Sequence, residues 1–211
     1  NIDINSATRN GIVVMNTPDV NTISAAEHTV AMMLALSRNI SIGDFELKQN
    51  KWNRHLLIGS ELRNKTLGIV GLGKIGREIM VRCLSFGMKI IGYDPFVNQK
   101  MFNSEEIEIV ELDDLTKNSD FITIHVPLND DTRDLFNYNR LKAMKKTARI
   151  INVSRGGIIN ESDLAKSLID KEITGAAIDV YTKEPIEKDN PLIDAPNILL
   201  TPHLGASTKE A

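Results

Sequence analysis

Three residues that could carry out acid/base chemistry lie in the second half of the chain, each just after an apolar run. Arg155 follows "IINVS", Glu184 follows "DVYTK" and His203 follows "LLTP". A histidine can take the hydroxyl proton of an alcohol, a carboxylate beside it fixes its orientation, and an arginine fork suits a substrate carboxylate. Taken singly, each has an ordinary alternative: a surface arginine, a turn glutamate before Pro185 and a structural histidine. Together they predict proton transfer on a small hydroxy acid.

A glycine-rich segment, "TLGIVGLGKIGREI", predicts where a cofactor would bind. Gly71, Gly73 and Gly76 form G-x-G-x-x-G where an apolar run turns into a helical pattern. The first glycine permits a tight turn, the second lets a pyrophosphate approach the backbone and the third allows the helix to pack close to the strand. The backbone amides of Lys74 and Ile75 then face the phosphates at the positive end of the helix.

Two carboxylates extend this prediction. The next apolar run ends at Asp94, 23 residues after Gly71 (94 − 71), where a carboxylate can accept from both ribose hydroxyls and repels a 2′-phosphate, which favours NAD over NADP. The alternative is a simple turn residue before Pro95. Asp179 closes an apolar run, an expensive place for a carboxylate unless it contacts something such as the nicotinamide amide. Helix capping is the alternative there.

The elements that must position these residues alternate along the chain. Apolar, β-rich runs occur at 11–16, 66–71, 89–94, 121–126, 148–153, 175–180 and 197–202, and helical patterns occur at 74–86, 137–145 and 161–173. Such alternation predicts an α/β fold, a doubly wound parallel sheet of the Rossmann type with helices on both faces. Open sheets of this kind bind ligands beyond the carboxyl ends of their strands, where the three charged residues would lie. We expect residues 1–211 to form one NAD-binding domain.

An early helix is unusual in its composition. Ser24 and Glu27 form a capping-box pattern, and the helix that they open should run past Arg38. Its stretch 30–36 is apolar on all sides, which predicts burial against its own sheet and against something else. A second subunit and a helix buried within one fold are equally compatible with this pattern.

Composition restricts the partners and the compartment. The formal charge is −3, the pI is about 5.9 and no run of Lys or Arg exceeds a pair, so neither nucleic acid nor an anionic membrane is an expected partner. The single cysteine, Cys83, cannot form an intrachain disulfide and is expected to be a buried, inert thiol in a reducing, cytoplasmic location. The chain begins at Asn1 rather than Met, and we expect a piece of a longer polypeptide.

Five segments, taken in their order along the chain, resemble the D-2-hydroxyacid dehydrogenase family over essentially its whole length: "GLGKIGREI", "GYDP", "INVSRGG", "GAAIDVYTKEP" and "TPHLGAST". The resemblance implies that Arg155 orients the substrate, Glu184 supports the histidine and His203 is the acid/base. It implies no metal. The NAD contacts that it implies are at Gly71, Gly73, Lys74, Ile75, Gly76, Asp94, Val126, Pro127, Thr132, Val153, Ser154, Arg155, Asp179, His203, Gly205 and Ala206. His125, before Val126, could line the adenosine pocket or simply end a strand.

Within the family, "NTPDVNTISAAEHTVAMMLALSR", "KWNR" and "HLGASTKEA" most resemble the branch that oxidises 3-phosphoglycerate. Hydroxypyruvate or glyoxylate reductases and D-lactate dehydrogenases are the alternatives in the same class. An NAD-sensing scaffold, as in the related corepressors, is the alternative of another class. The resemblance also implies a flanking substrate domain whose segments this chain lacks. Finally, it implies a homodimer formed through the helix around 24–38 and an arm around Trp52, although Trp52 could instead be an intramolecular anchor.

Overall fold

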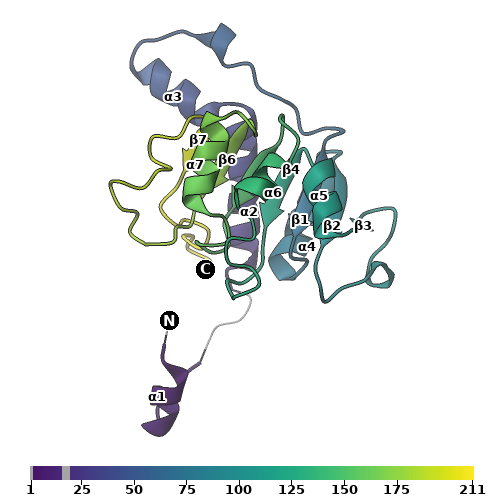
Figure 1. Ribbon diagram of the computed structural model, residues 1–211, viewed down its shortest axis with the longest axis vertical. Coiled ribbons are helices and arrows are strands. Elements are labelled where there is room, and N and C mark those ends of the chain that lie inside the picture. Colours follow the sequence, from purple (N-terminus) through teal and green to yellow (C-terminus); the bar gives the residue numbers. More distant parts are fainter. Residues whose placement is uncertain (1, 16–19) are drawn as a thin grey trace.

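One parallel sheet organises the chain. The computed structural model describes residues 2–15 and 20–211, and it contains a seven-stranded sheet in the order β3-β2-β1-β4-β5-β6-β7 (Figure 1). All neighbouring strands pair in parallel. The strands are β1 (Thr66–Val70), β2 (Lys89–Tyr93), β3 (Glu108–Ile109), β4 (Phe121–Ile124), β5 (Arg149–Asn152), β6 (Gly175–Ile178) and β7 (Ile198–Leu200). The predicted doubly wound α/β fold is confirmed.

The chain winds outward in both directions from β1. β2 and β3 lie on one side of it, while β4 to β7 lie on the other. The strand order therefore reverses between β1 and β4, and a doubly wound sheet opens a ligand-binding crevice at such a point. The central strands are buried on both faces, which explains their nearly continuous apolar sequences.

Helices cover both faces of the sheet and close two hydrophobic cores. Ile69 of β1 packs with Met33 and Ile79 in one core, while Ile122 of β4 packs with Leu115 and Leu164 in the other. Figure 1 shows α2 and α4 on the face opposite α6 and α7. The helices are α1 (Ile4–Arg9), α2 (Thr22–Ser37), α3 (Ile40–Lys48), α4 (Lys74–Ser85), α5 (Leu112–Asn118), α6 (Tyr138–Lys142) and α7 (Glu161–Ile169), with short 3-10 turns η1 (Arg54–Leu56) and η2 (Gln99–Met101).

Three local predictions near the N-terminus are wrong, and one of them is the end of α2, which stops at Ser37 rather than past Arg38. The run 11–16 forms no strand in its described part, 11–15, which follows α1 as a turn and irregular chain; Asn16 lies outside the described residues. Ser24 is not a helix cap either, because α2 begins at Thr22 after Asn21. The Ser24 hydroxyl lies 2.8 Å from Thr208 Oγ1 instead. A tertiary contact with the far end of the chain thus replaces the local capping bond.

The stretch 30–36 of α2 is largely covered by its own chain. Met32 and Met33 are buried in the core beneath α4, and Val30 is nearly so. The structure therefore favours the intramolecular alternative for most of this stretch. Exposed apolar side chains occur instead on α3 and the segment 52–58, where Trp52 is 77% exposed and so is not an intramolecular anchor. Among the described helices, none is long and apolar enough to cross a membrane.

Candidate active site

The glycine turn has the shape that a pyrophosphate requires. Gly71 has a φ of 97°, and a Cβ on it would lie 2.5 Å from the His125 carbonyl oxygen, so the turn after β1 closes against the end of β4. A Cβ on Gly76 would lie 2.2 Å from the Gly71 carbonyl oxygen, which fixes how closely α4 approaches the turn. Gly73, the N-cap of α4, has nothing within 4 Å of an added Cβ. The geometry fits a phosphate group approaching an open helix N-terminus.

Asp94 is attached to this turn. Its Oδ2 accepts the Leu72 amide at 2.9 Å and its Oδ1 accepts the Phe96 amide at 2.9 Å. The turn alternative is therefore part of its role. Each carboxylate oxygen has about two acceptor positions, so capacity for ribose hydroxyls remains beside the glycine turn.

A cleft of about 250 Å³ brings together residues from opposite ends of the chain. Of the residues predicted to be in the site, it is lined by Ile75, Val126, Pro127, Val153, Ser154, Arg155, His203, Gly205 and Ala206. The predicted residues that do not line it are Gly71, Gly73, Lys74, Gly76, Asp94, Thr132, Asp179 and Glu184. The glycine turn and Asp94 lie at the β1–β2 end of the same strand-end edge, so a ligand that is longer than the cleft would span both parts.

His203 and Glu184 form the pair that acid/base chemistry requires. The distance from His203 Nδ1 to Glu184 Oε2 is 2.7 Å, and Glu184 Oε1 accepts the Tyr181 amide at 3.0 Å. Burial alone would raise the pKa of Glu184, but the hydrogen bonds from His203 and Tyr181 outweigh it and hold that pKa below its ordinary value. The carboxylate therefore stays ionised, and a proton on Nδ1 leaves Nε2 of the neutral ring as the acceptor.

The backbone at His203 is itself unusual. Its φ is 57°, a left-handed conformation that few residues other than glycine adopt. Residues held in such conformations cluster at functional sites, where the surrounding contacts determine them.

Arg155 is presented by a tightly held loop after β5. Buried Asn152 accepts the Ser154 amide at 3.0 Å and donates its own side-chain N–H to the Arg155 carbonyl oxygen at 2.9 Å. The Arg155 guanidinium itself is exposed and donates to the Ser154 carbonyl oxygen at 2.6 Å. A Cβ on Gly156 would lie 1.9 Å from the Tyr181 carbonyl oxygen. This loop and the one that carries Glu184 are therefore packed main chain against main chain.

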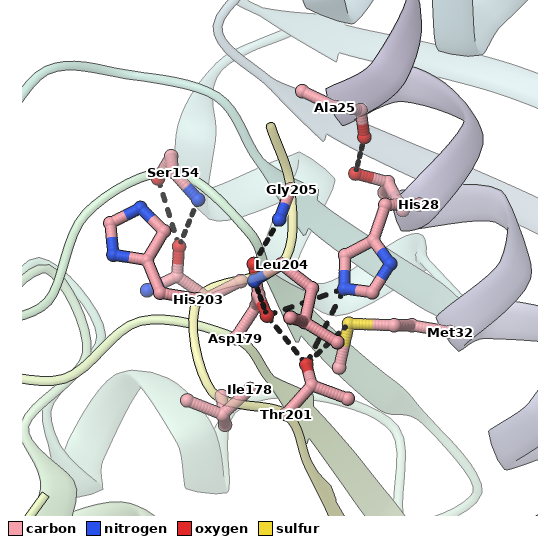
Figure 2. Close-up of polar contacts among 12 residues, drawn as sticks. Ala25, His28, Met32, Ser154, Ile178, Asp179, Thr201, His203, Leu204 and Gly205 are labelled. Atoms are coloured by element: carbon pink, nitrogen blue, oxygen red, sulfur yellow. Dashed lines mark hydrogen bonds and ion pairs between the residues drawn. The ribbon is translucent and has the colours of Figure 1, made fainter. Parts of the chain in front are cut away.

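Asp179 anchors the loop that carries His203. It is fully buried, and it accepts the backbone amides of Leu204 at 2.7 Å and Gly205 at 2.8 Å (Figure 2). Thr201 Oγ1 donates to it at 2.6 Å. It caps no helix, so that alternative is wrong, and a contact with a carboxamide stays a prediction. Its observed partners are on the loop that carries His203.

His125 also lines the cleft, but it is unsuited to proton exchange. Its Nε2 lies 2.7 Å from the hydroxyl oxygen of buried Thr123. Burial lowers the pKa of His125 to about 3, so the ring is neutral at working pH and cannot be the base that charges during turnover. Thr132 donates to the Pro127 carbonyl oxygen at 2.6 Å, which shapes the loop after β4 rather than the cleft itself.

Sequence reasoning missed Asn21 and Ala25, which line the cleft from the start of α2. It also missed His28, whose Nε2 lies 3.3 Å from Asp179 Oδ1. Helical periodicity on α2 signals its buried face, but nothing local shows that this face meets the end of β6. Within residues 2–15 and 20–211, no group of three or more His, Cys, Asp or Glu side chains could hold a metal ion.

The doubly wound sheet has a glycine turn at its switch point and an acidic residue after β2. An arginine, a glutamate and a histidine follow β5, β6 and β7. Together these features define the cofactor domain of a nicotinamide-dependent dehydrogenase. The comparison with protein families identifies the particular dehydrogenase family. Residues 30–205 match the model of the D-isomer specific 2-hydroxyacid dehydrogenase, NAD binding domain. The chain belongs to this family and contains its NAD-binding domain.

Individual relatives agree with this assignment. The chain is 49% identical over 211 residues to a D-3-phosphoglycerate dehydrogenase from Synechocystis sp. and 46% identical to one from Homo sapiens, in each case over 100% of this chain. It covers 38% and 39% of those proteins, about two fifths of their length. A crystal structure of NAD-dependent formate dehydrogenase from Staphylococcus aureus in complex with NAD has a TM-score of 0.89 and 34% identity, covering 99% of this chain and 62% of that one.

Proposed function

We propose that this chain is the cofactor domain of an enzyme that oxidises 3-phosphoglycerate to 3-phosphohydroxypyruvate with NAD, a step in L-serine biosynthesis. The observation that carries the oxidation is the 2.7 Å contact of Glu184 with His203, which lines the same cleft as Arg155. The substrate rests on similarity to relatives named D-3-phosphoglycerate dehydrogenase, at 49% and 46% identity.

Each residue of the site has a distinct role in the proposed reaction. When bound, NAD supplies the acceptor for the hydride that leaves the hydroxyl-bearing carbon. Nε2 of His203 accepts the hydroxyl proton as that hydride departs, and Glu184 stabilises the resulting imidazolium across the Nδ1 contact. The Arg155 guanidinium leaves its own loop carbonyl and binds the substrate carboxylate beside the reacting carbon.

A substrate panel on the complete protein tests this proposal. 3-Phosphoglycerate should give NADH at a far higher kcat/KM than glycerate, glycolate or D-lactate. A preference for one of the latter would replace the substrate with that of a hydroxypyruvate or glyoxylate reductase or of a D-lactate dehydrogenase. No turnover with any of them, together with an NAD-dependent change in sedimentation, would instead support an NAD-sensing scaffold.

The preference for NAD has its own test. The Asp94 carboxylate lies beside the glycine turn through its 2.9 Å contact with Leu72, where it would accept ribose hydroxyls and repel a 2′-phosphate. Calorimetry should show NAD binding more tightly than NADP, and Asp94→Ala should weaken NAD binding about tenfold. Equal affinity of the unaltered protein for both cofactors would contradict the assignment.

We further propose that residues 1–211 bind NAD but turn over slowly without the flanking substrate domain. The glycine turn, Asp94 and Asp179 all belong to this one sheet edge. Orienting the reacting carbon against the nicotinamide can contribute about 7 to 11 kcal/mol, and an open cleft with one arginine cannot supply it. A turnover rate for this chain equal to that of the complete protein, or failure of the folded chain to bind NAD, would contradict the proposal.

The exposed surface supports a homodimer that forms through α3 and the segment 52–58 rather than through the middle of α2. Phe45 is 63% exposed, Trp52 77% and Ile58 83%. Several large apolar side chains exposed within one short stretch of chain are a feature of interaction surfaces. Phe45→Glu should shift sedimentation toward the monomer, whereas Ile169→Glu, on the exposed side of α7, should not. A strictly monomeric unaltered protein at high micromolar concentration would contradict the dimer.

The single thiol is buried as predicted. Cys83 has no solvent exposure, and burial raises its pKa to about 12, so it is an inert thiol. The cytoplasmic location stays a proposal. It rests on this cysteine usage.

A further inference from the structure

The loop that carries His203 is held on both sides by one buried carboxylate. Asp179, at the end of β6, accepts the hydroxyl of Thr201 before the histidine and the amides of Leu204 and Gly205 after it, at 2.6, 2.7 and 2.8 Å. Thr201, Leu204 and Gly205, on both sides of His203, are thus all bound to the same carboxylate. The left-handed φ of 57° at His203 lies between these attachment points.

His28 of α2 completes this anchor from the opposite side. Its Nε2 is 3.3 Å from Asp179 Oδ1 and 3.4 Å from Thr201 Oγ1. Thr201 has one hydroxyl proton, and it points to Asp179 at 2.6 Å. Both neighbours of His28 Nε2 are therefore acceptors, and the proton must be on Nε2. Figure 2 shows His28 and His203 on opposite sides of Asp179.

The burial of the carboxylate is the reason that a further donor such as His28 matters. Asp179 has no solvent exposure, and an ionised carboxylate away from water is stable only when donors surround it. Gly205 approaches so closely that an added Cβ would lie 2.9 Å from Val153 Cγ1 and 3.3 Å from Asp179 Oδ2. The loop therefore fits the carboxylate in one arrangement, and a missing donor would let both shift.

We propose that His28 is a positioning residue for the acid/base histidine: its Nε2–H fixes the Asp179 carboxylate and the Thr201 hydroxyl, and through them the turn that presents His203 to the cleft. His28 does not line the cleft, so it acts through these partners. The effect on turnover rests on the proposed function, whereas the effect on the loop does not.

Hydrogen exchange without cofactor or substrate tests the structural part. In His28→Ala, exchange of the Leu204 and Gly205 amides should accelerate about tenfold, in line with the loss of one buried hydrogen bond. The Leu72 amide, bonded to Asp94 at 2.9 Å, should be unchanged. His28→Gln places an N–H donor near the same position and should restore most of the protection. Glu27→Gln, on the same helix with its side chain 65% exposed, is the matched control and should change nothing.

Kinetics of the complete enzyme test the functional part. His28→Ala should lower kcat about tenfold while leaving the KM for NAD within about twofold, and His28→Gln should recover kcat. If His28→Ala does not fold, Thr201→Val, which removes only the hydroxyl link, should give the same pattern. Unchanged exchange at Leu204 and Gly205 in folded His28→Ala would overturn the proposal. So would a normal kcat in an active enzyme, or failure of His28→Gln to rescue. Lack of turnover by the unaltered enzyme would instead contradict only the proposed function.

Discussion

Two histidine–carboxylate pairs hold the loop that follows β7, and their surroundings are opposite. His203 and Glu184 are 47% and 36% exposed at the cleft and lie 2.7 Å apart. His28 and Asp179 are 19% and 0% exposed beneath the loop and lie 3.3 Å apart. An exposed pair contributes little to stability but can exchange protons with a ligand, whereas a buried carboxylate is costly to disturb. The same side-chain chemistry is therefore suited to proton transfer in one place and to fixing loop geometry in the other.

The largest effect should follow from removing the exposed histidine. His203→Ala in the complete enzyme should lower kcat by about 10²- to 10⁴-fold, the usual contribution of a general acid/base group. NAD affinity measured by calorimetry should stay within about twofold, since the glycine turn and Asp94 are unchanged. A loss of activity caused by unfolding would show in the urea midpoint, which we expect to be unaltered. A kcat within tenfold of the original would contradict the role of His203.

Changing the buried carboxylate should instead affect stability. Asp179→Asn replaces an acceptor with an amide whose N–H faces other donors, and it should lower the free energy of unfolding by about 3 kcal/mol. Urea unfolding measures this change. Asp189→Asn, at an exposed position, should change it by less than about 0.5 kcal/mol. Equal stability of the two variants would mean that Asp179 is not an anchor.

The partner of the exposed histidine should have an intermediate effect on rate and little on stability. Glu184→Gln removes the charge that stabilises the imidazolium but keeps an oxygen near Nδ1, so kcat should fall about 10- to 100-fold. Stopped-flow measurement of the first turnover would separate this step from product release. If kcat fell no more than twofold, the contact with His203 would be structural only.

The smallest effect concerns acid stability. The folded-state pKa of Glu184 is lowered, so its contribution is fully present above its unfolded pKa of about 4.3 and is lost as pH falls through the folded value. Because this side chain is 36% exposed, the contribution should be below about 1 kcal/mol. The stability difference between the original protein and Glu184→Gln, measured by urea unfolding, should be larger at pH 6 than at pH 3. A difference that grows on acidification has the wrong sign.

The sequence predicts the sheet well because its signals are local. Six of the apolar runs coincide with strands, and the glycine turn follows directly from its spacing. β3 was missed because it is only two residues long, at Glu108–Ile109. The short helices α1, α3 and α5 were missed as well. Ser24 misled because Thr208, a residue 184 positions away, competes for its hydroxyl.

The exposed pair could be predicted and the buried pair could not, for a related reason. Arg155, Glu184 and His203 follow apolar runs, so topology alone brings them to one edge. His28 contacts Thr201 across 173 positions of sequence, and a histidine on a helix gives no local sign of its tertiary partner. Asp179 was recognised as an expensive buried carboxylate, yet two of its donors are backbone amides, which every residue except proline carries.

Gly156 connects the architecture to the way such a site can diversify. Because its α-carbon packs directly against the Tyr181 carbonyl, with room for no Cβ, the spacing between the arginine loop and the glutamate loop is set by main chain. Side chains around the cleft can then change without altering the spacing between these two loops. The spacing of the two loops is therefore independent of the side chains that line the cleft. Directed evolution of new substrates should therefore leave Gly156 untouched.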